Sequence, residues 1–275
     1  MLFACGDKMG RLKVIVEYIV LGIVQGISEM LPISSSGHMK IVKELLNISN
    51  NDLSLEILFH LASLLSLCIF FAPTLKKLMV NNYLYIVKHK REYKGDFKYL
   101  LCLCIASIPA GIVGILLKDK IELLFSDVRY VGISLIVTSL ILYITYKLPS
   151  KNKEITYKSS FVIGLFQGVG IIPGISRSGV TYLGAKGVGV ENKKASEFIF
   201  LMLIPVTFGS FLFSFDNIVS IISVDTIIPC IVGFIVSFIF TYLSLSLFSK
   251  VMVNKRILVI SGYCFLLGVI TILFL

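Results

Sequence analysis

Two polar stretches interrupt an otherwise apolar chain, and their residue types suit the handling of an anion. The first, residues 25–38, contains the carboxylate of Glu29, a proline–serine–glycine turn and an imidazole. The second, residues 167–179, carries Arg177 where the first has a serine. Phosphoryl transfer uses groups of these kinds around one anion: a hydroxyl, an imidazole, a carboxylate and a guanidinium.

The second stretch repeats the first at an offset of 142 residues. The matched pairs are Gln25 and Gln167, Gly26 and Gly168, Ile33 and Ile175, Ser34 and Ser176, Ser36 and Ser178, and Gly37 and Gly179. Arg177 stands at the position that matches Ser35. We therefore predict that the two stretches form the two halves of one active site.

Glu29 is the first candidate catalytic residue. It follows Gln25 by four residues, so both side chains share a face if the helix continues that far. An ionisable group at membrane depth is costly and is functional by default. The alternative is a glutamate at a helix end in the membrane interface, which is how we interpret Glu17, because it has no polar motif beside it.

The serine-rich turns predict an anion site. A helix N-terminus offers free backbone N–H groups and hydroxyl donors, although simple capping explains the same serines. Arg177 needs an anionic partner, and its planar fork fits phosphate; a structural pair with Glu29 is the alternative. The predicted substrate-binding residues are Gln25, Ser34, Ser36, Gly37, Ser176, Ser178 and Gly179.

His38 follows Ser35 by three residues, close enough on a helix to share its face. The predicted catalytic residues are Glu29, Ser35, His38 and Arg177. The sequence leaves open whether Ser35, His38 or a water molecule is the nucleophile. A lone histidine in a membrane is often a helix–helix hydrogen-bonding residue, and His60, without a comparable setting, is set aside.

The composition indicates an integral membrane protein. The 275 residues are 56% hydrophobic and 15% charged, whereas soluble domains carry about 25% charged residues. The net charge of +10 comes from basic residues crowded into a few loops, which favours membrane anchoring and no nucleic acid. The six cysteines fall mainly in apolar runs without metal-type spacing.

The apolar pattern predicts an all-α polytopic membrane protein forming one domain over 1–275. Pro32 and the serines after it break the helical pattern, so residues 12–46 read as a re-entrant hairpin rather than one span. Repeat 1 covers about 12–147 and repeat 2 about 159–275, with a second hairpin at 159–190. Full spans are predicted at about 53–72, 98–117, 130–147, 195–215, 225–249 and 256–274.

Each half is thus one re-entrant hairpin and three spans, and an odd number of spans gives an inverted-topology repeat whose site lies near the midplane. Basic loops at 76–98 and 147–158 are expected inside, and the loops at 118–129 and 216–225 outside. This topology leaves Lys8, Arg11 and Lys13 outside, against the rule that basic residues lie on the cytoplasmic side. A full span over 14–33 would remove that conflict but also the symmetry.

At these residues the chain resembles the undecaprenyl-pyrophosphate phosphatase family of the bacitracin-resistance type. Gln25, Glu29 and the run Leu31-Pro-Ile-Ser-Ser-Ser-Gly-His38 fit its first signature, and Pro173-Gly-Ile-Ser-Arg-Ser-Gly179 fits its second. The repeat that carries both signatures covers nearly the whole chain, which makes the match specific.

The resemblance implies hydrolysis of undecaprenyl pyrophosphate to undecaprenyl phosphate and bacitracin resistance. It also implies a bacterial plasma membrane, a lipid substrate and a site open to the outer face. No cofactor is certain, but the family's preference for Mg²⁺ or Ca²⁺ would make Glu29 a candidate ligand. A homodimer is left open by the sequence. The main rival is a transporter or flippase, because broken helices in inverted repeats are transporter architecture.

Overall fold

The computed structural model describes residues 2–48, 54–117, 127–149, 151–221, 223, 226–253 and 256–275. Within these residues the regular elements are helices, apart from one isolated bridge between Lys153 and Val190. The helices are α1 (Leu2–Met30), α2 (Ser35–Leu45), α3 (Ser54–Phe70), α4 (Ala72–Ile86), η1 (Arg91–Tyr93), α5 (Lys94–Leu116), α7 (Val128–Lys147), α8 (Tyr157–Val169), α9 (Arg177–Gly187), α10 (Asn192–Phe213), α11 (Phe215–Ile221), α12 (Ile227–Val253) and α13 (Arg256–Phe274).

The predicted spans correspond to observed helices. In the described part of the chain, five helices, α5, α7, α10, α12 and α13, are long and apolar enough to cross a membrane. The sixth predicted span, α3, reaches that length only together with α4, and the two helices meet at a bend of 72°. Pro73 explains the bend, because it cannot donate the backbone hydrogen bond that would continue α3.

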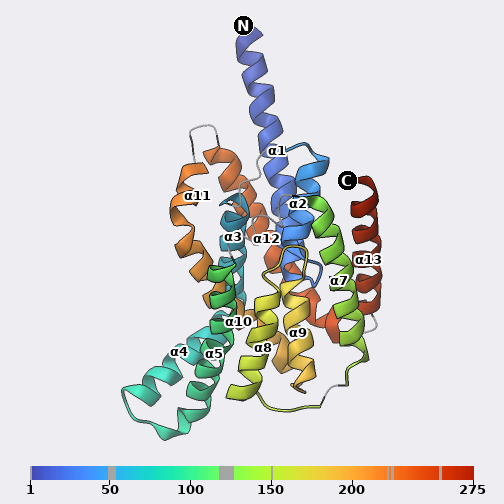
Figure 1. Cartoon of the computed structure of the whole chain (residues 1–275). Helices are drawn as coiled ribbons and strands as arrows, with labels where there is room; N and C mark the ends of the chain where they lie inside the picture. The colour runs from blue at the N-terminus through green and yellow to red at the C-terminus, as the bar shows by residue number, and fades with distance from the viewer. Residues whose placement is uncertain are drawn as a thin grey trace.

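Three helices differ from the expectation. α1 is continuous to Met30 and much longer than the apolar run at residues 12–24, and it extends beyond the rest of the bundle (Figure 1). α4 and α11 lie where the sequence analysis placed loops. α4 begins at a proline-containing first turn, where proline is well tolerated, and it leaves the bundle at an angle beside the start of α5 (Figure 1).

Both predicted helix breaks are present. Pro32 follows the end of α1, and residues 31–34 turn the chain into α2, where Ser34 accepts a hydrogen bond from the backbone N–H of Gly37. In the second copy, residues 170–176 join α8 to α9, and Ser176 accepts from the N–H of Gly179 at 3.1 Å. The predicted capping role of these serines is confirmed.

Close glycine contacts hold the helix pairs in the bundle. Gly22 and Gly26 of α1 lie against α12, where an added Cβ at Gly22 would come within 2.6 Å of the Gly233 carbonyl oxygen. At the same 142-residue offset, Gly164 of α8 lies against α5, and a Cβ there would come within 2.4 Å of the Ala106 carbonyl oxygen. Small residues at such spacing let membrane helices approach closely.

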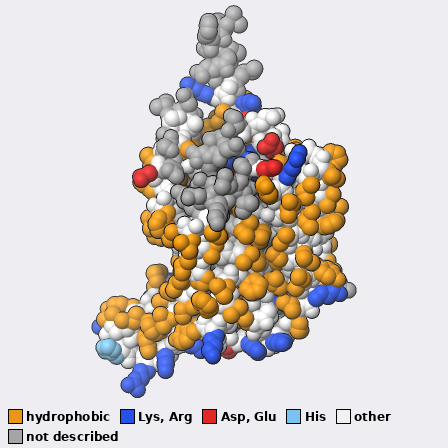
Figure 2. All heavy atoms as spheres, viewed as in Figure 1, with side chains coloured by type: hydrophobic (Ala, Val, Ile, Leu, Met, Phe, Trp, Pro, Cys, Tyr) orange, Lys and Arg blue, Asp and Glu red, His pale blue; other side chains and the backbone are white. Residues whose placement is uncertain are grey.

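The outer surface fits a bilayer. Figure 2 shows apolar side chains over the middle of the face it displays, with Lys and Arg side chains gathered at its lower end. That end carries the turn between α4 and α5, where Lys88, Lys90, Arg91 and Lys94 are exposed. The chain is therefore a multi-pass membrane protein. The predicted outer loop at 118–129 falls largely outside the described residues, as do Asp225 and Lys255.

Candidate active site

The two interhelical turns meet in the middle of the bundle (Figure 1). A Cβ on Gly37 would lie 3.1 Å from the Cα of Gly174, and the Ser178 hydroxyl donates to the Leu31 carbonyl at 3.4 Å. Gly174 has a φ of +82°, and a side chain there would also collide with Ser134. Glycine is needed at this contact, which brings the two polar stretches together as predicted.

Thr138 of α7 holds the backbone of the second turn by two hydrogen bonds. Its hydroxyl donates to the Gly174 carbonyl at 2.9 Å and accepts from the Ser176 N–H at 3.0 Å. Thr138 is fully buried, so these two backbone groups would otherwise have no access to water. Nothing in the sequence pattern of its span distinguished this threonine from packing residues.

Glu29 is the centre of the site. Its Oε2 accepts a hydrogen bond from the Gln25 amide at 3.0 Å and from the Ser35 hydroxyl at 2.5 Å. The same oxygen lies 3.1 Å from Nε2 of His60 on α3. The shared helical face of Gln25 and Glu29 is thus confirmed, and Ser35 points its proton at a carboxylate that could receive it.

Arg177 and Gln167 face the same small pocket. The pocket is small, about 10 Å³, and brings together polar groups from both copies with apolar groups of α10. It is lined by Glu29, Gln167, Arg177, Ser178, Thr181, Ile199, Phe200 and Leu203. The Arg177 Nε and the Gln167 Nε2 are buried in it without a hydrogen-bond partner. Unpaired buried donors of this kind indicate an absent acceptor, such as a phosphate oxygen.

The remaining predicted binding residues line the two turns. Ser36 lies 3.4 Å from the Ser34 hydroxyl, and Ser178 lies 3.4 Å from the Ser176 hydroxyl, so the two copies share this contact. Their backbones differ, because φ is +71° at Ser34 and −71° at Ser176. Gly37 and Gly179 each place a backbone N–H at the start of a helix, but those N–H groups are already bonded to the capping serines.

His38 faces away from Glu29. Its Nδ1 donates to the Ser34 carbonyl at 2.7 Å, and its Nε2 lies 2.7 Å from the Tyr263 hydroxyl of α13. The two rings are stacked, with centroids 5.6 Å apart. His38 therefore joins the first turn to α13. Its catalytic role stays a prediction, and the Ser35 hydroxyl is hydrogen-bonded to Glu29.

His60, whose position in the sequence predicts no role, is the described side chain that lies within ion-pair distance of Glu29. The role of His60 was missed because the sequence of α3 gives its apolar residues but not the face that packs against α1. Gln167 was matched to Gln25 by the repeat but not assigned a role, and that match was the signal for it. Glu17 pairs with Lys13 at 3.7 Å, in agreement with its interfacial interpretation.

No group of three or more His, Cys, Asp or Glu side chains in the described residues could hold a metal ion. Glu29 contributes one carboxylate, and the buried Oε1 of Gln25 lacks a hydrogen-bond partner. Two protein oxygens would fit a Mg²⁺ ion that takes its other ligands from substrate phosphates and water.

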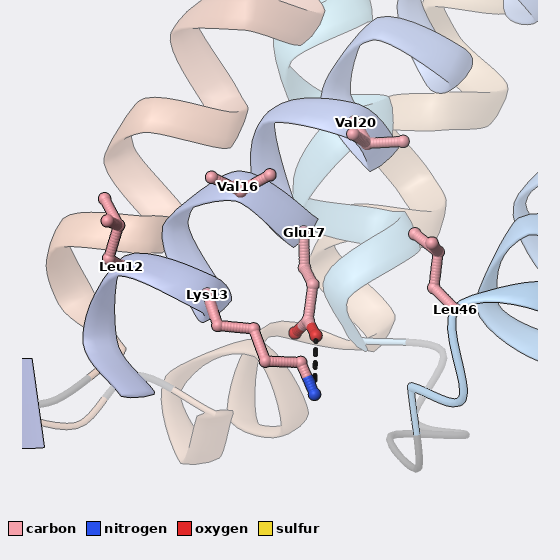
Figure 3. A pocket seen from close by; sticks show the side chains of 6 residues that line it. All are labelled: Leu12, Lys13, Val16, Glu17, Val20 and Leu46. Carbon is pink, nitrogen blue, oxygen red and sulfur yellow. Dashed lines mark ion pairs between the residues drawn. The ribbon is translucent and has the colours of Figure 1, made fainter. Parts of the chain in front are cut away.

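A larger pocket of about 570 Å³ lies elsewhere, between the outer part of α1 and the end of α2 (Figure 3). It is lined by Leu12, Lys13, Val16, Glu17, Val20 and Leu46. The polar groups drawn there are those of the Lys13–Glu17 ion pair, which satisfy each other (Figure 3). This apolar recess offers no nucleophile or anion-binding group, so the smaller polar pocket is the candidate site.

Fold and site together define a class: a multi-pass helical membrane protein whose polar pocket is formed where two broken helix pairs meet. Within that class the family is shown by comparison. The chain belongs to the family described as bacitracin resistance protein BacA, whose model matches residues 18–270.

Several curated relatives are similar over nearly their whole length. Undecaprenyl-diphosphatase 2 of Bacillus thuringiensis (strain Al Hakam) is 38% identical over 97% of this chain and all of its own. Undecaprenyl-diphosphatase of Oceanobacillus iheyensis is 39% identical over 95% of this chain and 97% of its own. Undecaprenyl-diphosphatase 1 of Halalkalibacterium halodurans is 33% identical over 95% of this chain and 97% of its own.

Proposed function

We propose that this protein hydrolyses undecaprenyl pyrophosphate to undecaprenyl phosphate and inorganic phosphate, and so confers bacitracin resistance. The observation that carries the proposal is the Ser35–Glu29 hydrogen bond beside the unpartnered Arg177 Nε. Phosphoryl transfer needs a hydroxyl, a proton acceptor and an anion-binding group. Here the Ser35 hydroxyl is hydrogen-bonded to Glu29, and Glu29 lines the same pocket as the Arg177 guanidinium. The family and the names of the relatives support the same substrate.

In the proposed mechanism the Ser35 oxygen attacks the terminal phosphorus while Glu29 takes the hydroxyl proton. The Oγ–P bond forms as the anhydride P–O bond breaks, and undecaprenyl phosphate leaves. Water then hydrolyses the phosphoserine, releases inorganic phosphate and restores the Ser35 hydroxyl. Arg177 and Gln167 stabilise the negative charge on the transferred group. The Ser35–Glu29 contact supports Ser35 over His38 or water as the nucleophile.

A divalent cation, Mg²⁺ or Ca²⁺, is part of the proposal. Glu29 and the Gln25 amide oxygen would hold it, and the pyrophosphate would complete its coordination. When bound, the ion would neutralise charge on the phosphate oxygens. On this view a chelator abolishes phosphate release, and added Mg²⁺ or Ca²⁺ restores it.

We further propose an inverted-topology repeat in a bacterial plasma membrane, with the site open to the outer face. Both ends of the α1–α2 pair lie at the top of Figure 1 and both ends of the α8–α9 pair at the bottom, which supports two re-entrant hairpins of opposite direction. The basic α4–α5 turn supports a cytoplasmic lower end. A homodimer would be tested by the mass of the purified protein in detergent.

A flippase of the same carrier lipid is the rival function, and the fold favours it as much as the enzyme. Ser35 favours the enzyme, because a transporter needs no hydroxyl hydrogen-bonded to a buried carboxylate. The test is phosphate release from undecaprenyl pyrophosphate by purified protein in detergent, where no second compartment exists. Release by wild type and its loss in Arg177→Ala would support the enzyme. No release by folded wild type with either cation would favour the flippase.

A further inference from the structure

The first turn contains a strained residue at a position where the second turn is relaxed. Ser34 has a φ of 71° and a ψ of 99°, in the positive-φ region that residues with a side chain rarely adopt. The matching residue, Ser176, has a φ of −71° and lies in the extended region. Both serines cap the helix that follows, so capping does not explain the difference.

The position of the proline explains why the strain falls on Ser34. In the second turn the positive φ belongs to Gly174, which adopts it without a steric cost. At the 142-residue offset Gly174 matches Pro32, whose ring fixes φ at about −65°. The first turn therefore has its positive φ at a serine, and this serine directly precedes Ser35, the proposed nucleophile.

His38 holds the strained residue in place. Its Nδ1 donates to the Ser34 carbonyl oxygen at 2.7 Å, and its backbone N–H donates to the same oxygen at 3.2 Å. In the second copy the matching residue is Val180, whose backbone N–H bonds the Ser176 carbonyl but whose side chain cannot donate. The copy with the strained serine is thus the copy with an additional donor on that serine.

Tyr263 in turn holds His38. Its hydroxyl lies 2.7 Å from Nε2 of His38, and the two rings stack with their planes 22° apart. With both ring nitrogens bonded, the imidazole cannot rotate without breaking one of the two contacts. Tyr263 is itself fixed because α13 packs on α7 (Figure 1), where the Ser261 hydroxyl donates to the Ser139 carbonyl at 2.8 Å. α7 also carries Thr138, so one helix supports both turns.

We infer that Tyr263 is a positioning residue for phosphoryl transfer, which acts through His38 on the backbone of Ser34. These contacts keep Ser34 at its positive φ, and so keep the Ser35 hydroxyl directed at Glu29. The inference deepens the proposed function and rests on it for the reaction itself. It assigns His38 to the support of the turn, because both of its ring nitrogens are bonded to groups outside the Glu29 cluster.

The first test measures turnover. Tyr263→Phe keeps the stacked ring and removes the hydroxyl, so kcat for phosphate release from undecaprenyl pyrophosphate should fall by roughly tenfold or more, because misplacing a reacting group is costly. KM should change by less than about twofold, because Arg177 and Gln167 belong to the second copy. Tyr242→Phe on α12 is the matched control: it is similarly exposed, its ring contact with Phe70 survives the change, and it should keep wild-type kcat. Wild-type kcat in folded Tyr263→Phe would overturn the inference.

The second test follows the effect through Ser34. Glycine adopts positive φ without a steric cost, so in a Ser34→Gly background Tyr263→Phe should lower kcat by less than about threefold. An equal loss in both backgrounds would contradict the route through Ser34.

The third test separates support of the turn from a role of His38 in the chemistry. The amide nitrogen of asparagine occupies nearly the place of a histidine Nδ1, so His38→Asn keeps a donor for the Ser34 carbonyl, whereas His38→Gln places its amide further out. We expect kcat of His38→Asn to exceed that of His38→Gln by roughly tenfold. Equal inactivity of the two variants would assign His38 to the chemistry and overturn the inference.

The fourth test needs no substrate. In full-length protein labelled with ¹³C-serine in detergent, the signals of Ser34 and Ser176 are identified by their loss in Ser34→Gly and Ser176→Gly. The Cα and Cβ shifts of Ser34 should report a positive φ in the wild type and should move in Tyr263→Phe, while those of Ser176 stay. An unmoved Ser34 signal would overturn the inference, whether or not the protein is a phosphatase. No phosphate release by folded wild type would instead count against the proposed function, and a moved Ser34 signal would still support the contact.

Discussion

At the residue scale the site is organised by one carboxylate oxygen. Glu29 Oε2 contacts the Gln25 amide of α1, before the first turn, and the Ser35 hydroxyl of α2 and the His60 ring of α3, after it. Three donors on one oxygen stabilise a buried negative charge and fix its direction. The Ser35 hydroxyl is thereby hydrogen-bonded to a carboxylate that lines the same pocket as Arg177.

Removing either partner of the Ser35–Glu29 contact should stop the chemistry. We expect Ser35→Ala and Glu29→Gln each to lower kcat for phosphate release by roughly 100-fold or more, because the nucleophile or its proton acceptor is lost. Glu17→Gln is the matched control, a carboxylate on the same helix that pairs with Lys13 instead, and should keep wild-type kcat. Near-normal turnover by Ser35→Ala would point to water or His38 as the nucleophile.

At the element scale the two turns are rigid because other helices hold them. Thr138 of α7 bonds the second turn on both sides, and Tyr263 of α13 holds the first turn through His38. Short turns in apolar surroundings need such partners, because their backbone groups have no water to bond. The anion-binding groups are therefore positioned by helices that contribute no catalytic residue themselves.

Thr138→Val tests this support. The change keeps the shape of the side chain but leaves the Gly174 carbonyl and the Ser176 N–H without their partner, at a cost of about 1–3 kcal/mol for each group. We expect lower thermal stability in detergent and a several-fold higher KM, because Arg177 follows Ser176 directly. Thr145→Val removes a buried hydroxyl of α7 that bonds only its own helix, and should leave KM unchanged.

Close helix packing can be tested at Gly164. Gly164→Ala would put a Cβ 2.4 Å from the Ala106 carbonyl oxygen, so α8 and α5 must move apart. We expect a loss of about 1–3 kcal/mol in the free energy of unfolding, measured by thermal denaturation in detergent. Gly111→Ala on α5 is the control, because no heavy atom lies within 4 Å of its added Cβ, and its stability should not fall. Equal stability of the two variants would contradict the observed packing.

At the scale of the whole molecule, the two copies face each other across the pocket. α1 packs on α12 and α8 packs on α5, and each contact uses glycines at matching positions of the repeat. Helix pairs related in this way bring one turn from each half to the centre, where neither turn alone offers both a carboxylate and a guanidinium. The site depends on the association of the halves.

The proposed topology predicts which surfaces face outside the cell. In a background without the six native cysteines, Glu44→Cys at the exposed end of α2 should react with a membrane-impermeant thiol reagent in intact cells. Lys90→Cys in the exposed α4–α5 turn should react only after the membrane is opened. The reverse pattern would place the pocket's open side toward the cytoplasm. Reaction of both in intact cells would contradict the proposed spans.

The sequence by itself determined the class of the protein and the position of its helix breaks. Apolar runs, Pro32 and Pro173, and capping serines act locally, so the spans and both turns were predicted close to their observed bounds. The repeat also identified the two polar stretches as partners, and they meet through Gly37 and Gly174.

The tertiary structure alone decided which side chains face Glu29. His60 lies 31 residues further along the chain, and its contact depends on how α3 is rotated against α1. The direction of His38 toward α13 and the support from Thr138 depend on packing in the same way. Periodicity predicts which residues share one face of a helix, but it does not predict which helix packs against that face.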